Sequence, residues 1–572
     1  MVTVLGIYNP PWLIAGPHEG SAVIVRDAKI LAAVEEDRIT RIKHDGNVLI
    51  WNSIKEVLRI TSIKPADIDA VAIPWESPEE TLFTKLRDLK LASVIHYPYV
   101  RYVSITRTRQ MLEAFGIKAP IWYVNHHRSH AASAFLTSGM KECSVITLDG
   151  QGDRDESLSA WEVQNYEMKN IATICAPTFG DFYSAVTYVV GFKMNDGEGK
   201  TMGLASYGDP IIIYDKIAHF LRVNGLHVEG IVNKIDRMQV DVTDVRPFVP
   251  YRHLIPENNN ELLNLARVYR KEDIAAAAQK LLEDRVLEFV RNVIAKTRKN
   301  RICLAGGVAL NMKLNQKIRE MEEVEDVYIF PNPGDSGVAV GAALQVCKEL
   351  MKREGIDCPN DRMVHTYFGT SYSDEEVVRV LDEYRLEYQE LKEPEKAAAD
   401  LIAEGRVVGW FQGRLEFGPR ALGNRSVLAD PRDNKMKDKI NKYLKKRDWF
   451  MPFAPSMLSE AKDEYLEEAV EAPFMIMGFN VKKEKIREIP AVVHVDGTAR
   501  PQTVTRDINP SYWQLIREFE KQSGIPLILN TSFNRHGQPM VRSPEDAALH
   551  VVWGAVEYLI IHKYLVDAKV KL

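Results

Sequence analysis

Two histidines in the stretch VNHHRSHAASAF have the spacing of a metal-binding pair. Residues 121–124 read as a strand, Asn125 is a plausible helix N-cap, and the residues after it favour a helix. On that helix His126 and His130 are four residues apart and share one face. Two imidazoles on one face can bind a single metal ion, although a pair of ordinary surface or core histidines has the same spacing.

Two carboxylates extend this pair to a possible ligand set. Asp149 follows the predicted strand 144–148 in TLDGQGD, and Asp335 follows the predicted strand 327–330 in FPNPGDSG. Acids in glycine-bearing turns at sheet ends can project into a shared crevice. Two histidines and two carboxylates, with positions left for ligand oxygens, suit Fe(II), Mn(II) or Zn(II) better than a closed structural zinc site. We expect a metal centre of these four residues, with Fe(II) as the first choice.

Glycine-rich turns indicate where a nucleotide can approach the backbone. Gly150 lies in DGQGD, and Gly306, Gly307 and Asn311 lie in AGGVALN, each after a predicted strand. Such glycines let backbone N–H groups reach phosphate or sugar, but similar turns occur in most α/β proteins. The chain has neither GxxxxGK[ST] nor a well-placed GxGxxG, so a P-loop or Rossmann site is excluded.

The C-terminal part of the chain offers guanidinium groups on turn-rich segments. GRLEFGPRALGNRS is rich in glycine and carries several arginines, and arginine forks there suit phosphate or carboxylate. The lysine run near residues 435–446 reads mainly as an exposed helix face, with the arginine that follows it as the exception. In LILNTSFN, small polar side chains after a strand can bind a polyphosphate or a carbamoyl group. The candidate residues are Arg414, Arg420, Arg425, Arg447, Arg500, Arg506 and Asn530.

The elements that must position these groups alternate between strands and helices. Strands are predicted at 2–8, 22–25, 144–148, 302–305 and 327–330, and helices at 273–293 and 338–350. A polar, irregular stretch at 351–364 separates a second series, with strands at 406–411 and 526–529. This pattern predicts an α/β protein of two domains, and no internal repeat of 20 to 50 residues is apparent.

Composition narrows the class of protein. The 572 residues are roughly four ~150-residue domains in length, and 45% of them are hydrophobic and 27% charged, as in soluble globular proteins. The net charge of -5 lacks the basic field of a dedicated nucleic-acid binder. Five widely spaced cysteines favour a reducing cytoplasm over a disulfide scaffold. No signal peptide or membrane span is expected.

Taken together, the motifs resemble those of the O-carbamoyltransferases of the nodulation and antibiotic type. The resemblance covers nearly the whole chain. It implies an ASKHA-type domain over residues 1–355, similar to tRNA threonylcarbamoyltransferases, and a YrdC-like α/β domain over residues 366–572. The matching motifs are EExRxTRxKH, HHxxHAASA, DGQG, GKxMGLAxxG, AGGVxLN, GPRALGxRS, PFAPSML, RPQTV and LNTSFN.

The resemblance also implies a reaction. In this family the YrdC-like domain converts carbamoyl phosphate and ATP, used with Mg, into carbamoyladenylate. The first domain, with Fe(II), then transfers the carbamoyl group to a hydroxyl of a sugar or natural product, as in antibiotic biosynthesis. His18 matches the acceptor-activating histidine and Lys43 a basic residue near the adenylate. Arg420, Arg500 and Asn530 match residues that hold carbamoyl phosphate or nucleotide, and the four metal ligands match the set above.

The sequence departs from the family pattern at two positions, and two other functions remain as alternatives. The family commonly has Arg-Pro-Phe-Ala-Pro where this chain has Met451 before Pro452, so Arg447 or Lys446 is a candidate substitute. Glu19 follows His18 where Asp is usual, which bears on the acceptor rather than on the reaction. The alternatives are a tRNA threonylcarbamoyltransferase-like enzyme and a non-catalytic nucleotide-binding ASKHA regulator.

Overall fold

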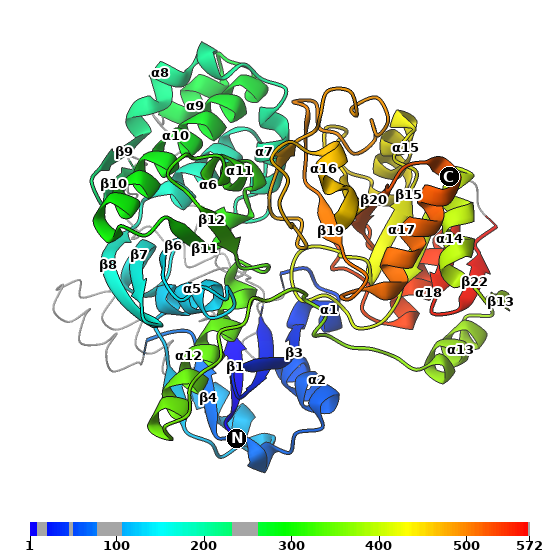
Figure 1. Ribbon diagram of the computed structural model, residues 1–572, viewed down its shortest axis with the longest axis horizontal. Coiled ribbons are helices and arrows are strands. Elements are labelled where there is room, and N and C mark those ends of the chain that lie inside the picture. Colours follow the sequence, from blue (N-terminus) through cyan, green and yellow to red (C-terminus); the bar gives the residue numbers. More distant parts are fainter. Residues whose placement is uncertain (9–19, 45–49, 77–105, 231–260, 570–572) are drawn as a thin grey trace, which may run out of the picture. The chain divides into compact units, whose positions relative to one another are not determined.

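The computed structural model describes residues 1–8, 20–44, 50–76, 106–230 and 261–569. The chain forms two compact units, which Figure 1 colours from blue to green and from green to red. The first unit contains Met1–Glu36 and His44–Met363. The second contains Val364–Leu572 and also the short segment Asp37–Lys43. A segment from early in the sequence therefore packs with the C-terminal part of the chain.

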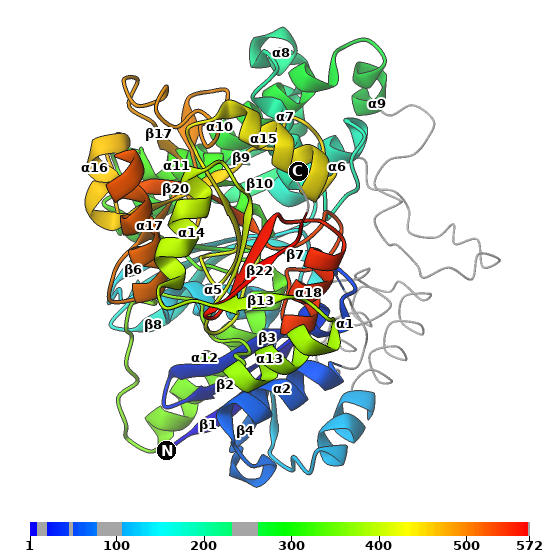
Figure 2. The ribbon, with the colours of Figure 1, turned by 90° about the vertical axis from the view of Figure 1, so that its right-hand side faces the viewer.

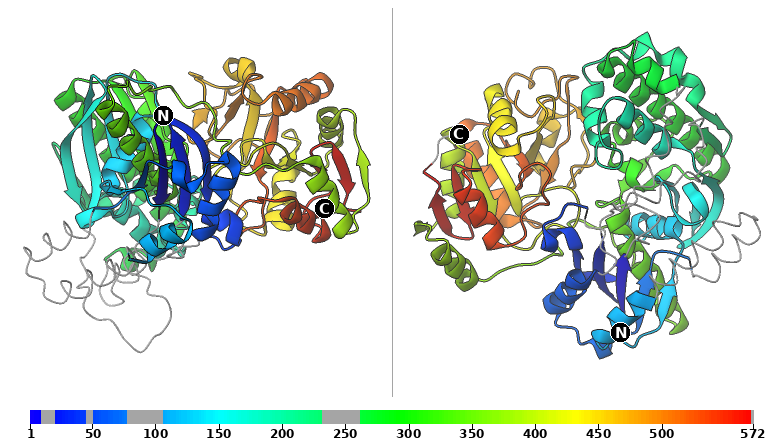
Figure 3. Two further views of the ribbon diagram at one scale, coloured as in Figure 1. Left: turned by 90° about the horizontal axis from the view of Figure 1, so that it is seen from below. Right: turned by 180° about the vertical axis from the view of Figure 1, so that it is seen from behind.

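The first sheet of the first unit is built around β1. Strand β2 pairs antiparallel with β1, and β3 pairs antiparallel with β2. On the other side β4 and then β5 continue the sheet in parallel, which gives the order β3-β2-β1-β4-β5. These strands are blue and cyan in Figure 1, and Figure 3 shows them from two further sides. Their bounds are Thr3–Tyr8 (β1), Ser21–Arg26 (β2), Lys29–Glu35 (β3), Ala70–Ile73 (β4) and Ile121–Tyr123 (β5).

The second sheet repeats this order and these directions. Strand β7 is antiparallel to β6, β8 is antiparallel to β7, and β11 and β12 follow in parallel on the other side of β6. The order β8-β7-β6-β11-β12 thus matches that of the first sheet strand by strand. This duplicated sheet is the ASKHA-type fold that the sequence predicts, although no repeat is visible in the residues. The bounds are Cys143–Leu148 (β6), Glu156–Gln164 (β7), Glu167–Cys175 (β8), Arg301–Ala305 (β11) and Asp326–Ile329 (β12).

Helices cover both sheets of the first unit. α5 follows β5, α12 follows β12, and the two helices pack against each other, with α12 also lying on β1. The alanines near the start of α10 are buried, and the helix packs against α6 and α7. The strands of a separate hairpin are Leu221–Asn224 (β9) and His227–Gly230 (β10). The helices are Trp51–Thr61 (α2), His126–Phe135 (α5), Phe179–Val189 (α6), Glu198–Ala205 (α7), Tyr214–Ile217 (α8), Glu261–Ala266 (α9), Lys271–Thr297 (α10), Met312–Arg319 (α11) and Val338–Arg353 (α12).

The second unit contains one large mixed sheet. Its order is β13-β22-β21-β14-β15-β20-β16-β19, and Figure 2 shows β13 and β22 at one edge. β14 is fully buried at the centre, where it pairs with β15 and β21. This α/β unit is consistent with the predicted YrdC-like domain. The strands are Tyr388–Glu390 (β13), Val408–Phe411 (β14), Arg425–Ala429 (β15), Ala454–Leu458 (β16), Gln502–Val504 (β19), Leu527–Ser532 (β20), Tyr558–Ile561 (β21) and Tyr564–Asp567 (β22).

Capped helices and a small strand pair complete the second unit. Ser373 and Ser543 each form a capping box at a helix start, and Gly524 in the left-handed conformation ends α17. Helix α1 (Glu36–Thr40) carries most of the early segment, and β17 (Phe479–Asn480) pairs with β18 (Thr498–Ala499). The remaining helices are Asp374–Glu383 (α13), Pro394–Ala403 (α14), Asn434–Lys439 (α15), Lys462–Tyr465 (α16), Pro510–Ser523 (α17) and Pro544–Val552 (α18).

Among the described residues, no helix is both long and apolar enough to cross a membrane.

A buried histidine makes the stability of the second unit depend on pH. His550 packs against Phe533 and Trp553, and burial lowers its pKa to about 4. The unfolded chain, with a histidine pKa of ~6.5, takes up a proton below that pH that the folded chain does not. Stability is therefore full above pH ~6.5 and is lost as the pH falls toward 4.

We expect a loss of about 2 kcal/mol between pH 7.5 and pH 5 from this residue. Urea unfolding of the second unit at both pH values measures it. His550→Gln should flatten the pH dependence, and an unchanged dependence in that variant would contradict the assignment to His550.

Candidate functional site

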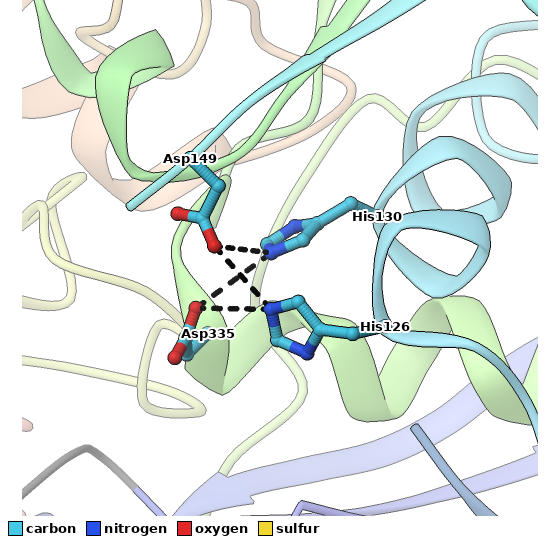
Figure 4. Close-up of side chains that lie close together, drawn as sticks. All are labelled: His126, His130, Asp149 and Asp335. Atoms are coloured by element: carbon cyan, nitrogen blue, oxygen red, sulfur yellow. Dashed lines mark hydrogen bonds and ion pairs between the residues drawn. The ribbon is translucent and has the colours of Figure 1, made fainter. Parts of the chain in front are cut away.

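Four side chains of the first unit meet at one point (Figure 4). The Nε2 atom of His126 lies 3.3 Å from Oδ2 of Asp149 and 3.7 Å from Oδ1 of Asp335. The Nε2 atom of His130 lies 3.6 Å from each of the same two oxygens. All four ligand atoms lie within 4.8 Å of one another. The structure thus brings together the four residues that the sequence proposes as metal ligands.

The duplicated fold explains why these residues meet. His126 and His130 lie on α5, directly after β5, and the Asn125 side chain caps this helix by accepting from the backbone N–H of Arg128. Asp335 occupies the equivalent place in the second half, between β12 and α12. Asp149 follows the central strand β6. Ligands therefore come from the ends of matching elements in the two halves.

Protein donors fix the outer oxygen of each carboxylate. The hydroxyl of Tyr8, the last residue of β1, donates to Oδ2 of Asp335 at 2.6 Å. The backbone N–H of Gly307 donates to Oδ1 of Asp149 at 2.9 Å. The indole of Trp75 stacks on the His126 ring with centroids 4.6 Å apart. These contacts leave one oxygen of each carboxylate directed at the histidines.

The histidines and the aspartates of the cluster shift one another's pKa values. Burial alone would lower the pKa of His126, but hydrogen bonds with Asp149 and Asp335 outweigh it and raise that pKa to about 10. Burial opposes ionisation of Asp149, yet its interactions with the two histidines hold its pKa well below the usual range. The pKa of Asp335 is likewise lowered. Two carboxylates thus stay ionised in a buried place because positive charge on the histidines compensates them, and a bound cation would do the same.

The donor set fits one divalent transition-metal ion. In a tetrahedral site with bonds of ~2.1 Å, neighbouring ligand atoms lie ~3.4 Å apart, close to the nitrogen–oxygen distances here. The buried Nε2 atom of His130 has no hydrogen-bond partner. Nitrogen and oxygen donors, without a thiolate, are compatible with Fe(II), Mn(II) or Zn(II). His126, His130, Asp149 and Asp335 would hold such an ion.

The histidine between the two ligands has another role. The Nδ1 atom of His127 hydrogen-bonds the hydroxyl of Thr147 at 2.6 Å, and that hydroxyl also contacts Ser159. Burial and the neighbouring His126 lower the pKa of His127 to about 3, so it is neutral. It packs in the core beside the cluster and supplies no ligand.

Removing the Tyr8 hydroxyl should weaken metal binding. Tyr8→Phe keeps the ring but frees Asp335 to rotate, and the loss of such an outer partner costs about 10- to 100-fold in metal affinity. Competition with a chelator on the full chain measures this. Tyr328→Phe removes another buried hydroxyl, which contacts Thr137 instead, and should leave the affinity unchanged. Equal affinity of Tyr8→Phe and the unmodified chain would show that Tyr8 does not orient Asp335.

The predicted nucleotide-binding glycines lie beside this cluster. Gly150 directly follows Asp149, and Gly306 has a φ of +95° that places Gly307 to donate to Asp149. A side chain at Gly306 would collide with the Leu148 carbonyl, 2.2 Å from its Cβ. Asn311 caps α11 and exchanges amide hydrogen bonds with Gln279. These contacts serve the metal cluster and the local fold.

The second unit gathers three arginines. Burial, and then the charges of Arg420 and Arg447, hold the pKa of Arg500 well below its usual range, so both of these guanidinium groups lie within electrostatic range of Arg500. Burial lowers the pKa of Arg420 and of Arg447 to about 10. In the described part of the chain, no carboxylate forms an ion pair with Arg420 or Arg500. Cations gathered without acids suit a polyanionic ligand.

Arg447 lies against the turn where the family usually has another arginine. Its Nε atom donates to the Asn441 side chain at 2.7 Å, and its guanidinium lies 4.6 Å from the centre of the Phe453 ring. It also reaches the Pro452 carbonyl. Arg447 therefore places its positive charge beside the residues that follow Met451.

Two other predicted ligand residues are used inside the fold. Arg425 is fully buried and donates to the carbonyls of Gln412, Gly413, Asn424 and Thr370, so these contacts hold the chain rather than a ligand. The Asn530 amide donates to Ser456 and to the Ala421 carbonyl, while its buried oxygen has no partner.

Of the two predicted catalytic residues, Lys43 and His18, the structure describes only Lys43. Lys43 is half-buried in the segment that packs with the second unit. His18 lies outside the described residues.

Several contributing residues give no sequence signal of their own. Tyr8 and Trp75 close one side of the metal cluster, but each looks like an ordinary aromatic residue in or after a strand. Lys445 belongs to the run expected on an exposed helix face, yet it is buried and donates to Ser532 and Asn534. The helix α15 ends at Lys439, and a wider turn over residues 440–445 points this lysine inward.

The fold and the candidate site together define a class of protein. A duplicated ASKHA-type unit with a two-histidine, two-aspartate cluster is joined to an α/β unit in which Arg420 and Arg500 have no pairing carboxylate among the described residues. Sequence profiles then identify the family: one described as "Carbamoyltransferase N-terminus" matches residues 14–344, and one described as "Carbamoyltransferase C-terminus" matches residues 399–568. The chain belongs to the carbamoyltransferase family and is a transferase.

Curated relatives agree with the family. Nodulation protein NolNO of Sinorhizobium fredii is 37% identical over 562 residues, covering 96% of this chain and 79% of its own length. Nodulation protein NolO of Bradyrhizobium diazoefficiens is 37% identical over 449 residues, covering 77% of this chain and 78% of its own. Among solved structures, component A of the Acidaminococcus fermentans (R)-2-hydroxyglutaryl-CoA dehydratase aligns at 16% identity and a TM-score of 0.33, covering 61% of this chain and 99% of its own.

Proposed function

We propose that this carbamoyltransferase is an ATP-dependent O-carbamoyltransferase. The second unit converts carbamoyl phosphate and ATP into carbamoyladenylate, and the first unit transfers the carbamoyl group to a hydroxyl of a sugar or another natural product. The arginine cluster of the second unit carries this proposal. Arg420 and Arg447 both lie within electrostatic range of Arg500, and no carboxylate among the described residues pairs with Arg420 or Arg500, which suits two phosphate-bearing substrates.

The reaction balances in three steps. Water cleaves carbamoyl phosphate to carbamate and phosphate. The carbamate oxygen attacks the α-phosphorus of ATP, which forms carbamoyladenylate and releases pyrophosphate. The acceptor hydroxyl then attacks the carbamoyl carbon, the bond to AMP breaks, and the hydroxyl proton goes to a base. The products are the carbamate ester and AMP.

The residues of the second unit bind and orient the phosphates. Arg420 and Arg500 offer guanidinium forks that match phosphate oxygens, and Arg447 adds charge from the turn before Pro452. The unpartnered oxygen of Asn530 can accept from a carbamoyl N–H. Lys43 supplies a further cation, and Mg accompanies ATP.

The residues of the first unit act on the acceptor and the carbonyl. A divalent ion held by the four-residue cluster, Fe(II) by preference, supplies Lewis-acid stabilisation of negative oxygen when it is bound. Tyr8 and Gly307 keep the two carboxylates oriented for it. His18, by its match to the family pattern, accepts the proton of the hydroxyl.

An assay of both half-reactions tests the proposal. The full chain is incubated with ATP and carbamoyl phosphate, with and without a panel of hydroxylated acceptors. We expect pyrophosphate release that needs carbamoyl phosphate, and AMP together with an acceptor heavier by one carbamoyl group when the right acceptor is present. Absence of pyrophosphate under all of these conditions would refute ATP-dependent adenylate formation.

A further inference from the structure

We infer that the residues between Glu35 and Arg41 position the loops of both candidate sites. In this segment, EEDRITR, Glu35 ends β3 in the first unit, and Arg38 and Arg41 belong to the second unit. The first unit's part contacts the loop of a metal ligand, and the second unit's part contacts the loop of a phosphate-binding arginine. The roles of these loops rest on the function proposed above.

Arg38 holds the arginine loop of the second unit directly. Its Nη2 atom donates to the Gly418 carbonyl at 2.9 Å, and the residue is 8% exposed. Gly418 has a φ of +127°, a backbone conformation that other residues rarely adopt, and Arg420 follows two positions later. A hydrogen bond at that carbonyl fixes the turn from which the Arg420 side chain extends.

Arg41 holds the same loop through a second element. It donates to the carbonyls of Pro539 (2.9 Å) and Met540 (2.5 Å), and its Nε atom lies 3.2 Å from Asp546. The Met540 side chain is buried in one cluster with Leu415 and Ala421, which flank the turn. The loop is therefore held at Gly418 by Arg38, and near Ala421 by Met540, which Arg41 fixes.

Glu35 serves the metal cluster in the same manner. Its Oε1 atom accepts from the Asn332 amide and the Ser336 hydroxyl, each at 3.3 Å. These two residues flank Asp335 in the turn before α12, and Ser336 also bonds Asn332. Glu35 is 3% exposed, so its carboxylate is committed to the interior. It orients the backbone that carries one of the four metal ligands.

The residues that make these contacts are close together in the sequence. Only two residues separate Glu35 from Arg38, so one short segment carries the contacts to both loops. Both arginines act on these loops through backbone carbonyls, at Gly418 and at Pro539 and Met540, so we assign them a positioning role. The segment thus holds one loop in each unit, through Glu35 in the first unit and through Arg38 and Arg41 in the second.

The test uses the full chain and two separate binding measurements. Calorimetric titration with carbamoyl phosphate, and separately with inorganic pyrophosphate, reports the arginine cluster, and metal affinity by chelator competition reports the metal centre. Arg38→Met keeps an apolar stem without donors and should bind both anions about tenfold more weakly, with metal affinity unchanged. Arg38→Lys, which retains a donor, should recover part of the loss, and Arg41→Met should weaken anion binding in the same direction.

Glu35 provides the reciprocal experiment. Glu35→Leu should lower metal affinity about tenfold while anion binding stays normal, and Glu35→Gln, which keeps an acceptor oxygen, should be near the unmodified chain. In pyrophosphate release, Arg38→Met should raise the KM for carbamoyl phosphate more than it lowers kcat. Unchanged anion binding in Arg38→Met, or unchanged metal affinity in Glu35→Leu, would overturn the inference. If the unmodified chain binds pyrophosphate but never uses carbamoyl phosphate, the proposed function fails while this test can still be read.

Discussion

Alanine in place of His126 should remove the bound metal and abolish carbamoyl transfer. His126 supplies one of four ligand atoms, and its ring also contacts Trp75 and Tyr8. Since the loss of an outer partner already costs about 10- to 100-fold in metal affinity, the loss of a ligand should cost more than about 100-fold. Metal content by elemental analysis and transfer to an identified acceptor are the two measurements.

Adenylate formation should not be affected by this change. Pyrophosphate release from ATP and carbamoyl phosphate should survive in His126→Ala, because the arginine cluster belongs to the other unit. His127→Gln is the matched control, since His127 is an equally buried neighbour that bonds Thr147 and contributes no ligand atom. Loss of both half-reactions in His126→Ala, or metal loss in His127→Gln, would contradict the separation of roles.

The spacing of His126 and His130 is a local property, which is why a sequence can reveal it. Asp149 and Asp335 are different, because their approach depends on two strands of one sheet ending at the same edge. A turn acid after a predicted strand is common, so the sequence offers candidates and the fold selects among them. The resemblance to the carbamoyltransferase family selects Asp149 and Asp335 among the turn acids, because the family's metal ligands match these positions.

The duplication of the first unit left no trace that a sequence pattern can detect. Strand order and direction are set by the backbone, and many side chains satisfy the same buried alternation. Tyr8 ends the central strand of one half, and Asp149 follows the central strand of the other. The residue that ends β6 in the place of Tyr8 is Leu148, so equivalent places hold unlike residues and no repeat appears.

The second unit shows where composition misleads. Arginines in a glycine-rich segment suggest residues that bind a ligand. Arg425 on β15 instead donates its hydrogen bonds to backbone carbonyls within the core. A lysine run suggests an exposed helix, yet Lys445 is buried because the helix widens after Lys439. In both cases the deciding factor is the direction of one side chain, which depends on contacts distant in the sequence.

Alanine in place of Arg420 should block adenylate formation with the metal centre intact. Arg420 forms no ion pair with any carboxylate that the structure describes, and its Nε atom is buried without a partner, so its donors remain for a ligand. Removal of one preorganised donor to developing negative charge costs about 100- to 1000-fold in rate. Pyrophosphate release with ATP and carbamoyl phosphate measures the effect, and metal content should equal that of the unmodified chain.

Arg506 is the matched control for this change. It lies close in sequence to Arg500, but it is exposed and rests against Trp513. Arg506→Ala should keep pyrophosphate release within about twofold, because an exposed guanidinium contributes little to binding a ligand elsewhere. Arg420→Lys keeps a charge without the fork and should recover only part of the rate, since bidentate contact with phosphate oxygens is lost. A normal rate in Arg420→Ala would remove this residue from the phosphate site and leave Arg447 and Arg500 to hold both substrates.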